Sequence, residues 1–249
     1  MSTTTNQTPD WPKIRNIGLD GFVISFGDQL SEPANRAALA FRQAVDAQRL
    51  EGVIESSTSL VSTYLRFDPL AVSHATLHKA LDILLASRDW LMADLPLGRR
   101  LWRIPAAFGG ETGPQLADAA AIAGMTEAEA ISAITQQRVR VQTIGFAPGM
   151  PYLGELSPDW NIPRMTSLNA KVPAGGICLA IRQLVLFPVA TPTGWRHIGQ
   201  TAVNLFRPDE DLPFLLKPGD EVAFTPVDAN ALSDLTHAPN GGAMSEVLP

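Results

Sequence analysis

The sequence predicts an α+β protein of two domains, a small α+β layer domain followed by a β-barrel or sandwich. The first third of the chain shows strand and helix patterns in the order strand, helix, strand, strand, helix. A Leu-Pro-Leu-Gly break follows at residues 95–98. From Val139 onward, short apolar runs alternate with turns rich in Gly, Pro, Asn and Asp, a pattern typical of barrels and sandwiches. We therefore expect one domain over residues 16–96 and a second over 97–227.

Two capped helices define the expected N-terminal domain. Ser31 is a predicted N-cap, and Pro33 fits the first helical turn. Apolar residues then recur at helical spacing to about Leu50. Ser73 is expected to cap a second helix with leucines on one face. Short β-branched and aromatic runs predict strands at residues 22–26, 52–55 and 60–66.

The expected second domain begins with a strand at 101–105. Gly113-Pro114 opens an Ala-rich helix that Gly124 can end, and a capping-box sequence at 126–129 starts another helix to about Gln136. Further strands are predicted at residues 139–144, 177–181, 184–188, 196–198 and 222–224. The polar ends of the chain, residues 1–15 and 228–249, are expected to be a disordered lead-in and a flexible tail.

Composition excludes several classes of protein. The chain has 249 residues, with 25 acidic and 19 basic ones, and its net charge of −6 disfavours a general nucleic-acid binder. Its single cysteine, Cys178, excludes an internal disulfide and a multi-cysteine metal site, and we expect a buried, inert thiol in a reducing compartment. No apolar run approaches the roughly 20 residues that span a bilayer. The first ten residues lack the features of a secretory signal, so we expect a cytoplasmic protein.

Three segments rich in glycine and proline are expected to carry the site. They span residues 145–154, 171–176 and 191–201, and they include aromatic, cationic and hydroxyl side chains. Glycine permits backbone angles that other residues resist, and proline fixes φ. We therefore expect rigid loops rather than a helix or a regular strand, including over 145–154. Binding sites tend to lie on loops of this kind, although purely structural turns are the alternative.

Other candidate side chains carry weaker signals. His74 and His78 lie four residues apart on a predicted helix, as metal ligands could, but we interpret them as a helix flank and predict no metal site. His197 has the chemistry of an acid or base, or of a capping residue. Lys171 and Arg164 either hold a carboxylate or phosphate or are solvated loop charges. Neither phosphate-binding glycine motif nor a serine-hydrolase elbow is present, so no self-contained nucleotide site is expected.

The ordered loops also support a resemblance to a known family. The matching residues are Gly145-Phe146-Ala147-Pro148-Gly149-Met150-Pro151-Tyr152-Leu153-Gly154, Pro163-Arg164, Val172-Pro173-Ala174-Gly175, Gly194-Trp195, Ile198-Gly199 and Thr201. Weaker agreement occurs at residues 27–28, 35–36, 59–61, 67–69 and 217–220, so that the resemblance covers about residues 17–224. In these residues the chain resembles the family of the 5-oxoprolinase B subunit and KipI, also called allophanate hydrolase subunit 1.

The resemblance implies a fold, partners and a function. It implies an N-terminal α+β domain followed by a cyclophilin-like β-barrel. It also implies a sister subunit of related barrel fold, which is the C-type subunit of 5-oxoprolinase or allophanate hydrolase subunit 2, and a third, A-type subunit of 5-oxoprolinase. Together these open 5-oxoproline to glutamate at the expense of ATP, and the chain alone is expected to be inactive. The alternatives are a regulator that binds and inhibits a histidine kinase, and one half of a biotin-dependent carboxyltransferase.

The resemblance and the loop chemistry together suggest roles for residues within and beside the three segments. The expected catalytic residues are Lys171, Arg164 and His197, with the cations holding a carboxylate and a phosphate. The backbone of 173–176 is expected to supply rigid N–H donors. The expected substrate-binding residues are Pro148, Gly149, Tyr152, Pro173, Ala174, Gly175, Gly176, Trp195, Gln200 and Thr201.

The chain also departs from the family pattern in several places. Gln115 stands where an Asp is usual, Ile134 or a neighbour where a His is usual, Val139 for a Tyr and Gln200 for an Arg. The sequence after the second glycine-rich segment, residues 183–188, differs as well. Because a carboxylate, a His and an Arg are replaced together, we expect a different lactam or amide substrate, or a non-catalytic role, as alternatives.

Overall fold

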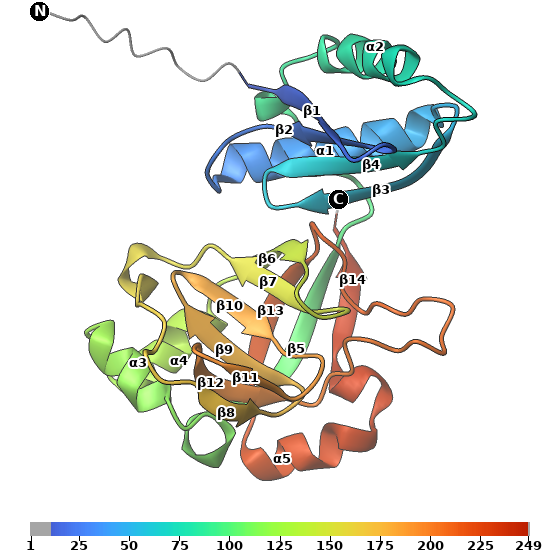
Figure 1. Cartoon of the computed structure of the whole chain (residues 1–249). Coiled ribbons are helices and arrows are strands. Elements are labelled where there is room, and N and C mark those ends of the chain that lie inside the picture. Colours follow the sequence, from blue (N-terminus) through green and yellow to red (C-terminus); the bar gives the residue numbers. More distant parts are fainter. Residues whose placement is uncertain (1–10, 249) are drawn as a thin grey trace, which may run out of the picture. The chain divides into compact units, whose positions relative to one another are not determined.

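The computed structural model describes residues 11–248, and the chain divides into two compact units between Pro96 and Leu97 (Figure 1). The first unit contains β1 (Lys13–Ile17), β2 (Gly21–Ser25), α1 (Glu32–Gln48), β3 (Val53–Ser59), β4 (Ser62–Phe67) and α2 (His74–Leu85). Within residues 11–248, no helix combines the length and apolar character that crossing a membrane requires.

The N-terminal unit is a four-stranded antiparallel sheet with both helices packed into one core. The strand order is β1-β2-β4-β3. Buried side chains of β2 and β4, such as Phe22 and Leu65, share a core with Phe41 of α1 and Leu81 of α2. The Ser31 and Ser73 hydroxyls accept hydrogen bonds from backbone N–H groups in the first turns of α1 and α2. The strands and helices predicted for this part of the chain are therefore confirmed.

The lead-in expected over residues 1–15 is wrong where the structure describes it from Lys13 onward. Lys13 to Ile17 form β1, which pairs along its whole length with β2. The strand escaped prediction because its side chains are half-buried or exposed, so that backbone pairing rather than an apolar pattern holds it. Residues 1–10 lie outside the described part of the chain.

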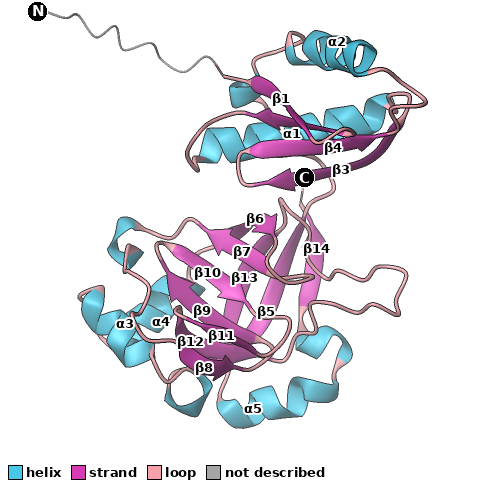
Figure 2. Ribbon diagram, viewed as in Figure 1, coloured by secondary structure: helices cyan, strands magenta, loops and turns pink. Residues whose placement is uncertain are grey.

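The second unit is a β-barrel with short helices around it (Figure 2). Its strands are β5 (Arg100–Phe108), β6 (Val139–Ile144), β7 (Pro151–Gly154), β8 (Asn169–Val172), β9 (Gly176–Ala180), β10 (Gln183–Leu186), β11 (Thr191–Thr193), β12 (Arg196–Thr201), β13 (Glu221–Pro226) and β14 (Met244–Val247). Its α-helices are α3 (Leu116–Ile122), α4 (Glu127–Thr135) and α5 (Ala229–Asp234). The predicted capping box at Thr126 and Glu129 is present at the start of α4.

Pairing between β5 and β12 closes the barrel. The large sheet has the order β12-β9-β10-β7-β6-β13-β5-β14, and β12 also pairs with β5. Seven strands therefore form a closed ring, with β14 outside it on β5. Ile104, Leu153 and Ile198 belong to the buried cluster that fills the interior. The α+β fold class and the barrel are confirmed, whereas a sandwich is not what forms.

Two expectations about the barrel are wrong. Residues Pro151 to Gly154 of the first glycine-rich segment form β7, which pairs with β6 and β10. A proline is tolerated as the first residue of a strand, so only residues 145–150 make the turn.

The expected flexible tail instead forms α5 and β14, because Asp228 caps α5 and β14 pairs with β5. Its polar composition concealed two buried apolar side chains, Leu232 and Ala243.

Leu232 provides a test of the ordered C-terminal segment. We expect Leu232→Ala to lower the free energy of unfolding by about 2 kcal/mol or more, because a buried leucine side chain leaves a cavity when truncated. Chemical denaturation of the two proteins measures the difference. Asn230→Ala, at an exposed position of the same helix, is the matched control. Equal stability of the Leu232 variant and the control would mean that this segment does not pack on the barrel.

Candidate functional site

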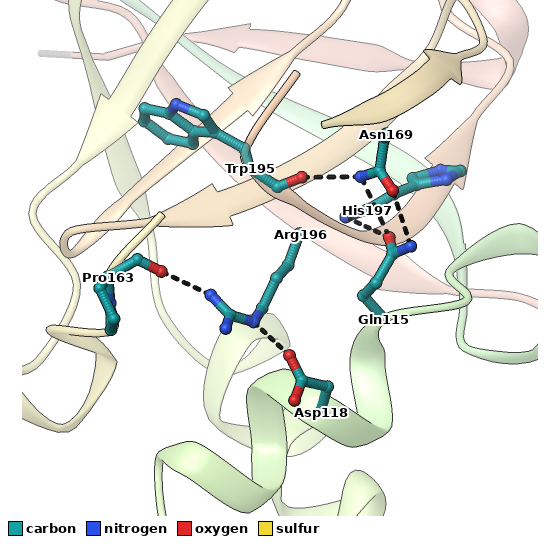
Figure 3. Close-up of polar contacts among 7 residues, drawn as sticks. All are labelled: Gln115, Asp118, Pro163, Asn169, Trp195, Arg196 and His197. Carbon is teal, nitrogen blue, oxygen red and sulfur yellow. Dashed lines mark hydrogen bonds and ion pairs between the residues drawn. The ribbon is translucent and has the colours of Figure 1, made fainter. Parts of the chain in front are cut away.

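The start of β12 is held by an amide network around Gln115. The Gln115 side chain donates from Nε2 to Asn169 Oδ1 at 2.9 Å, and its Oε1 accepts from the His197 N–H at 2.9 Å (Figure 3). Asn169 Nδ2 in turn donates to the Trp195 carbonyl at 3.0 Å. The Gln115 N–H donates to the His197 carbonyl at 3.0 Å. The Gln115 and Asn169 side chains together therefore fix the backbone on both sides of Arg196.

Arg196 anchors a second segment to the same strand. Its guanidinium donates from Nε to Asp118 Oδ2 and from Nη1 to the Pro163 carbonyl, each at 2.5 Å (Figure 3). The Arg196 side chain is buried, while that of Asp118 is more than half exposed. Because the carbonyl of Pro163 is held, the next residue, Arg164, is fixed beside β12.

Three of the predicted residues meet in one aromatic pocket. The Tyr152 and Trp195 rings lie edge to face with centroids 6.0 Å apart, and the Arg164 guanidinium carbon lies 5.3 Å from the Trp195 ring centroid. This geometry fits a cation–π contact. The pocket measures about 250 Å³ and is lined by Phe146, Met150, Tyr152, Arg164, Leu168, Phe187, Pro192, Thr193, Gly194 and Trp195. The glycine-rich segments 145–154 and 191–201 thus share one surface, whereas residues 171–176 do not contribute to it.

The chemistry of this pocket is that of an apolar box with one positive charge. Arg164 is the one cation among the described residues that line it. Met150, Phe187 and Trp195 belong to a small buried cluster separate from the barrel interior, so the pocket has a rigid floor. Partial burial raises the pKa of the Tyr152 hydroxyl, and the nearby Arg164 charge opposes that shift. Tyr152 therefore remains a neutral hydroxyl, able to donate a hydrogen bond at neutral pH.

A second hollow adjoins the bend at residues 173–176. Gln200 Nε2 donates to the Ala174 carbonyl at 2.6 Å, and Thr201 Oγ1 donates to the Gly175 carbonyl at 2.9 Å. Glycine is required at 175, because φ is +79° and a Cβ would lie 2.3 Å from the Thr201 carbonyl oxygen. Ala174, Gln200 and Thr201 line a hollow of about 390 Å³, together with Pro188 and residues near α5. None of its described lining residues carries a charge.

The bend does not offer all the donors that the sequence suggested. The Gly175 N–H donates to the Phe187 carbonyl at 2.7 Å, and the Gly176 N–H donates to the Pro173 carbonyl at 3.1 Å. Both groups are already used inside the protein, so the expected role as N–H donors to a ligand is wrong for these two residues. Their physical function is to hold the loop against Phe187 and β12.

His197 and Lys171 do not reach the aromatic pocket. The His197 side chain is 6% exposed, and its Nε2 lies 3.4 Å from the position that a Gly176 Cβ would occupy. Burial lowers the pKa of His197, although Gly199 and Gln200 oppose the shift, so the ring is neutral at pH 7. Lys171 is exposed on β8, next to the buried Val172, and successive strand side chains point to opposite faces. Neither residue lines either hollow.

The remaining candidate residues line neither hollow. Pro148 is exposed, and Gly149 packs against the Leu205 carbonyl with φ of +75°. His74 forms an edge contact with the Phe67 ring, and the described residues contain no cluster of three potential metal ligands. Burial raises the pKa of the Cys178 thiol well above its usual range, so the thiol is inert as predicted.

Three residues that organise the site were not predicted as site residues. Gln115 was noted only as a departure, while Asn169 and Asp118 gave no signal because polar residues near turns are common. Two other departures, Ile134 and Val139, lie buried in the barrel core and therefore affect packing rather than either hollow.

Comparison with known proteins agrees with this architecture. A family described as carboxyltransferase domain, subdomain C and D, matches residues 12–216. The chain is 33% identical over 219 residues to the B subunit of 5-oxoprolinase from Bacillus subtilis (strain 168), covering 85% of this chain and 91% of that protein. The chain belongs to the family of 5-oxoprolinase B subunits.

Two further similarities extend the comparison to parts of other proteins. The 5-oxoprolinase B subunit of Escherichia coli O157:H7 is 41% identical over 127 residues, which cover 51% of this chain and 58% of that protein. The crystal structure of TTHA0988 superposes with a TM-score of 0.70 at 29% identity and covers 87% of this chain. This chain spans 40% of the TTHA0988 chain, so it corresponds to one part of that longer protein.

The amide network gives a stability prediction for this family member. We expect Gln115→Ala to lower the free energy of unfolding by about 1–3 kcal/mol, because the buried His197 N–H and the Asn169 amide lose their partner. Gln115→Glu, which keeps an acceptor for His197 but cannot donate to Asn169, should be intermediate. Urea denaturation measures all three proteins, with Gln136→Ala at an exposed helix end as control. A Gln115→Ala variant as stable as this control would contradict the network's role.

His197 gives a pH prediction. An unfolded histidine binds a proton near pH 6.5, whereas burial lowers the pKa of folded His197. The unfolded state therefore binds more protons as the pH falls below about 6.5, and folding stability decreases. We expect this loss to be smaller in His197→Gln when unfolding is measured from about pH 7.5 to 5. Parallel stability curves for the two proteins would contradict the assignment.

Proposed function

We propose that this chain is the B-type subunit of an ATP-dependent enzyme that opens a cyclic amide, with 5-oxoproline as the expected substrate. The observation that carries the proposal is the 33% identity to the B subunit of a 5-oxoprolinase over 91% of that protein's length. The aromatic pocket supports it, because the Arg164 cation and the apolar walls suit a small anion with a flat amide. In this proposal a sister subunit of related fold and a third subunit complete the enzyme.

The proposed work of this chain is to bind and orient the substrate. A guanidinium pairs well with a carboxylate, so Arg164 holds the substrate carboxylate. The Tyr152 and Trp195 rings wall the planar amide and exclude water from one side of it. The Tyr152 hydroxyl is available to donate a hydrogen bond to the amide oxygen. An amide is resistant to attack because of resonance, so activation of that oxygen is the step that the whole assembly must provide.

The two hollows of the barrel unit described above do not fit ATP by themselves. A triphosphate requires several cations or backbone donors, and Arg164 is the single cation among the described residues around the aromatic pocket. The second hollow is uncharged along its described lining. We therefore propose that the other subunits provide the nucleotide site, and we assign no phosphate-transfer step to residues of this chain. Lys171 and His197 are not given catalytic roles in this proposal.

One alternative has a specific observation in its favour. The matching family is described as a carboxyltransferase domain, so a half-site for carboxyl transfer is the second candidate. The two candidate functions differ because only carboxyl transfer requires a carboxylated carrier.

The decisive experiment is to co-express the chain with its sister and third subunits and to assay opening of 5-oxoproline with ATP. Production of glutamate and ADP in equal amounts supports the proposal, whereas turnover only with a carboxylated carrier supports the alternative.

Arg164 provides the mutational test in that assembly. We expect Arg164→Ala to raise KM for 5-oxoproline about 10- to 100-fold, because a charge-assisted hydrogen bond to the substrate is lost. Arg164→Lys should recover part of the affinity. Arg103→Ala is the control, because Arg103 pairs with Glu246 and lines neither hollow. Unchanged KM and kcat in Arg164→Ala would remove the pocket from the proposed function.

A further inference from the structure

Phe146 combines two unfavourable features at the mouth of the aromatic pocket. Its backbone is left-handed, with φ of +71°, a conformation that is strained for any residue other than glycine. Its side chain is 80% exposed, although it lines the pocket. An exposed ring contributes little to packing, so the stability of the fold accounts for neither feature.

The backbone conformation of Phe146 contrasts with that of the glycine before it. Gly145, one residue earlier, does not adopt the left-handed region, and a Cβ there would meet nothing within 4 Å. The glycine is therefore at the position that tolerates a side chain, and phenylalanine is at the position that favours glycine. The turn is held by hydrogen bonds from Gly145 N–H to the Met150 carbonyl and from Met150 N–H to the Ala147 carbonyl, both at 3.1 Å. These contacts keep Phe146 strained, and strained residues of this kind cluster at ligand sites.

We propose that the Phe146 ring covers the ligand in the aromatic pocket and is a substrate-contacting residue. The inference rests on the proposed function of this pocket. Tyr152 and Trp195 supply two walls that touch each other, and the cation of Arg164 lies over Trp195. The pocket remains open at the rim, where Leu168 is also 71% exposed. A flat, uncharged group such as a cyclic amide would bury its open face against Phe146 while its carboxylate pairs with Arg164.

The structure also separates this role from that of the other exposed rings. Phe214 is 42% exposed, but it stacks on Phe206 with ring centroids 5.4 Å apart and lines neither hollow. Its exposure is explained by a partner within the chain. Phe146 forms no ring contact of this kind among the described residues, so a bound molecule is the partner that the pocket leaves room for.

The test uses substitutions that separate strain from binding. Phe146→Ala removes the ring and keeps the strain, Phe146→Gly removes both, and Phe146→Tyr keeps both. We expect KM for 5-oxoproline in the assembled enzyme to rise about tenfold for Ala and Gly and to stay near the original value for Tyr. The Gly variant should melt at a higher temperature than the Ala variant, because glycine relieves the left-handed strain.

Two controls complete the design. Leu60→Gly relieves a similar left-handed residue, with φ of +52° in the N-terminal unit, and should change no binding constant. Calorimetric titration of each full-length variant with 5-oxoproline reports binding without turnover, and affinity for the sister subunit is measured in parallel. Unchanged ligand binding in Phe146→Ala, or a loss confined to sister-subunit affinity, would overturn the proposal.

The outcomes also distinguish this inference from the proposed function. If the assembly fails to open 5-oxoproline but the Phe146 ring is needed for calorimetric binding, the inference stands and the proposed reaction falls. If Arg164→Ala raises KM and Phe146→Ala does not, the inference alone falls. If the original protein neither binds nor turns over 5-oxoproline, both fall.

Discussion

The seam at which β5 meets β12 is the contact on which the rest of the barrel unit depends. Residues of β12 pair with Phe108, Ala107 and Ala106 of β5, and this pairing turns an open sheet into a closed ring. The chain leaving β5 folds back on the seam so closely that a Cβ on Gly113 would lie 2.1 Å from the Ile198 carbonyl oxygen. Close approach at this point brings Gln115 and Asp118 against β12. The position of the aromatic pocket therefore follows from how the barrel closes.

Residues in and next to β12 line both hollows and the barrel core. Ile198 points into the barrel core, whereas Trp195, just before β12, forms a wall of the aromatic pocket. Gln200, further along β12, lines the second hollow. The two hollows are neighbours, because Phe187 lines one and Pro188 lines the other. The uncharged second hollow includes Gln200 at the position where the family pattern has an arginine. Of these two hollows, only the aromatic pocket has a charged side chain, that of Arg164, among its described lining residues.

Local signals in the sequence were sufficient for the helices and for most strands. The caps at Ser31, Ser73 and Thr126 act within one turn, so their meaning does not depend on distant residues. By contrast, β1 and β14 are held by backbone pairing with strands formed elsewhere in the chain, and their own side chains carry little apolar pattern. The strand β7 was also missed, because it begins with a proline and is formed by backbone pairing with β6 and β10.

The site was predictable only in part, because some of its residues carry local signals and others are brought together by contacts between distant segments. Aromatic residues in the glycine-rich segments and a cation outside them indicated the pocket, and Tyr152, Arg164 and Trp195 do meet there. The network that positions them joins residues as far apart as Gln115 and Asn169, and no short-range pattern contains that pairing. Lys171 was predicted to lie in the site but does not line the pocket. Whether a side chain on a short strand faces the pocket depends on the register of β8 against β11, which the sequence does not reveal. That register is fixed by tertiary contacts.

The most direct test of the central claim is a nuclear magnetic resonance titration of the full-length chain with 5-oxoproline. We expect saturable shifts of the Trp195 indole N–H and of the backbone amides of Tyr152 and Arg164, with little change at Lys171. Saturable binding that leaves these three residues unshifted would contradict the claim that segments 145–154 and 191–201, together with Arg164, form the ligand pocket.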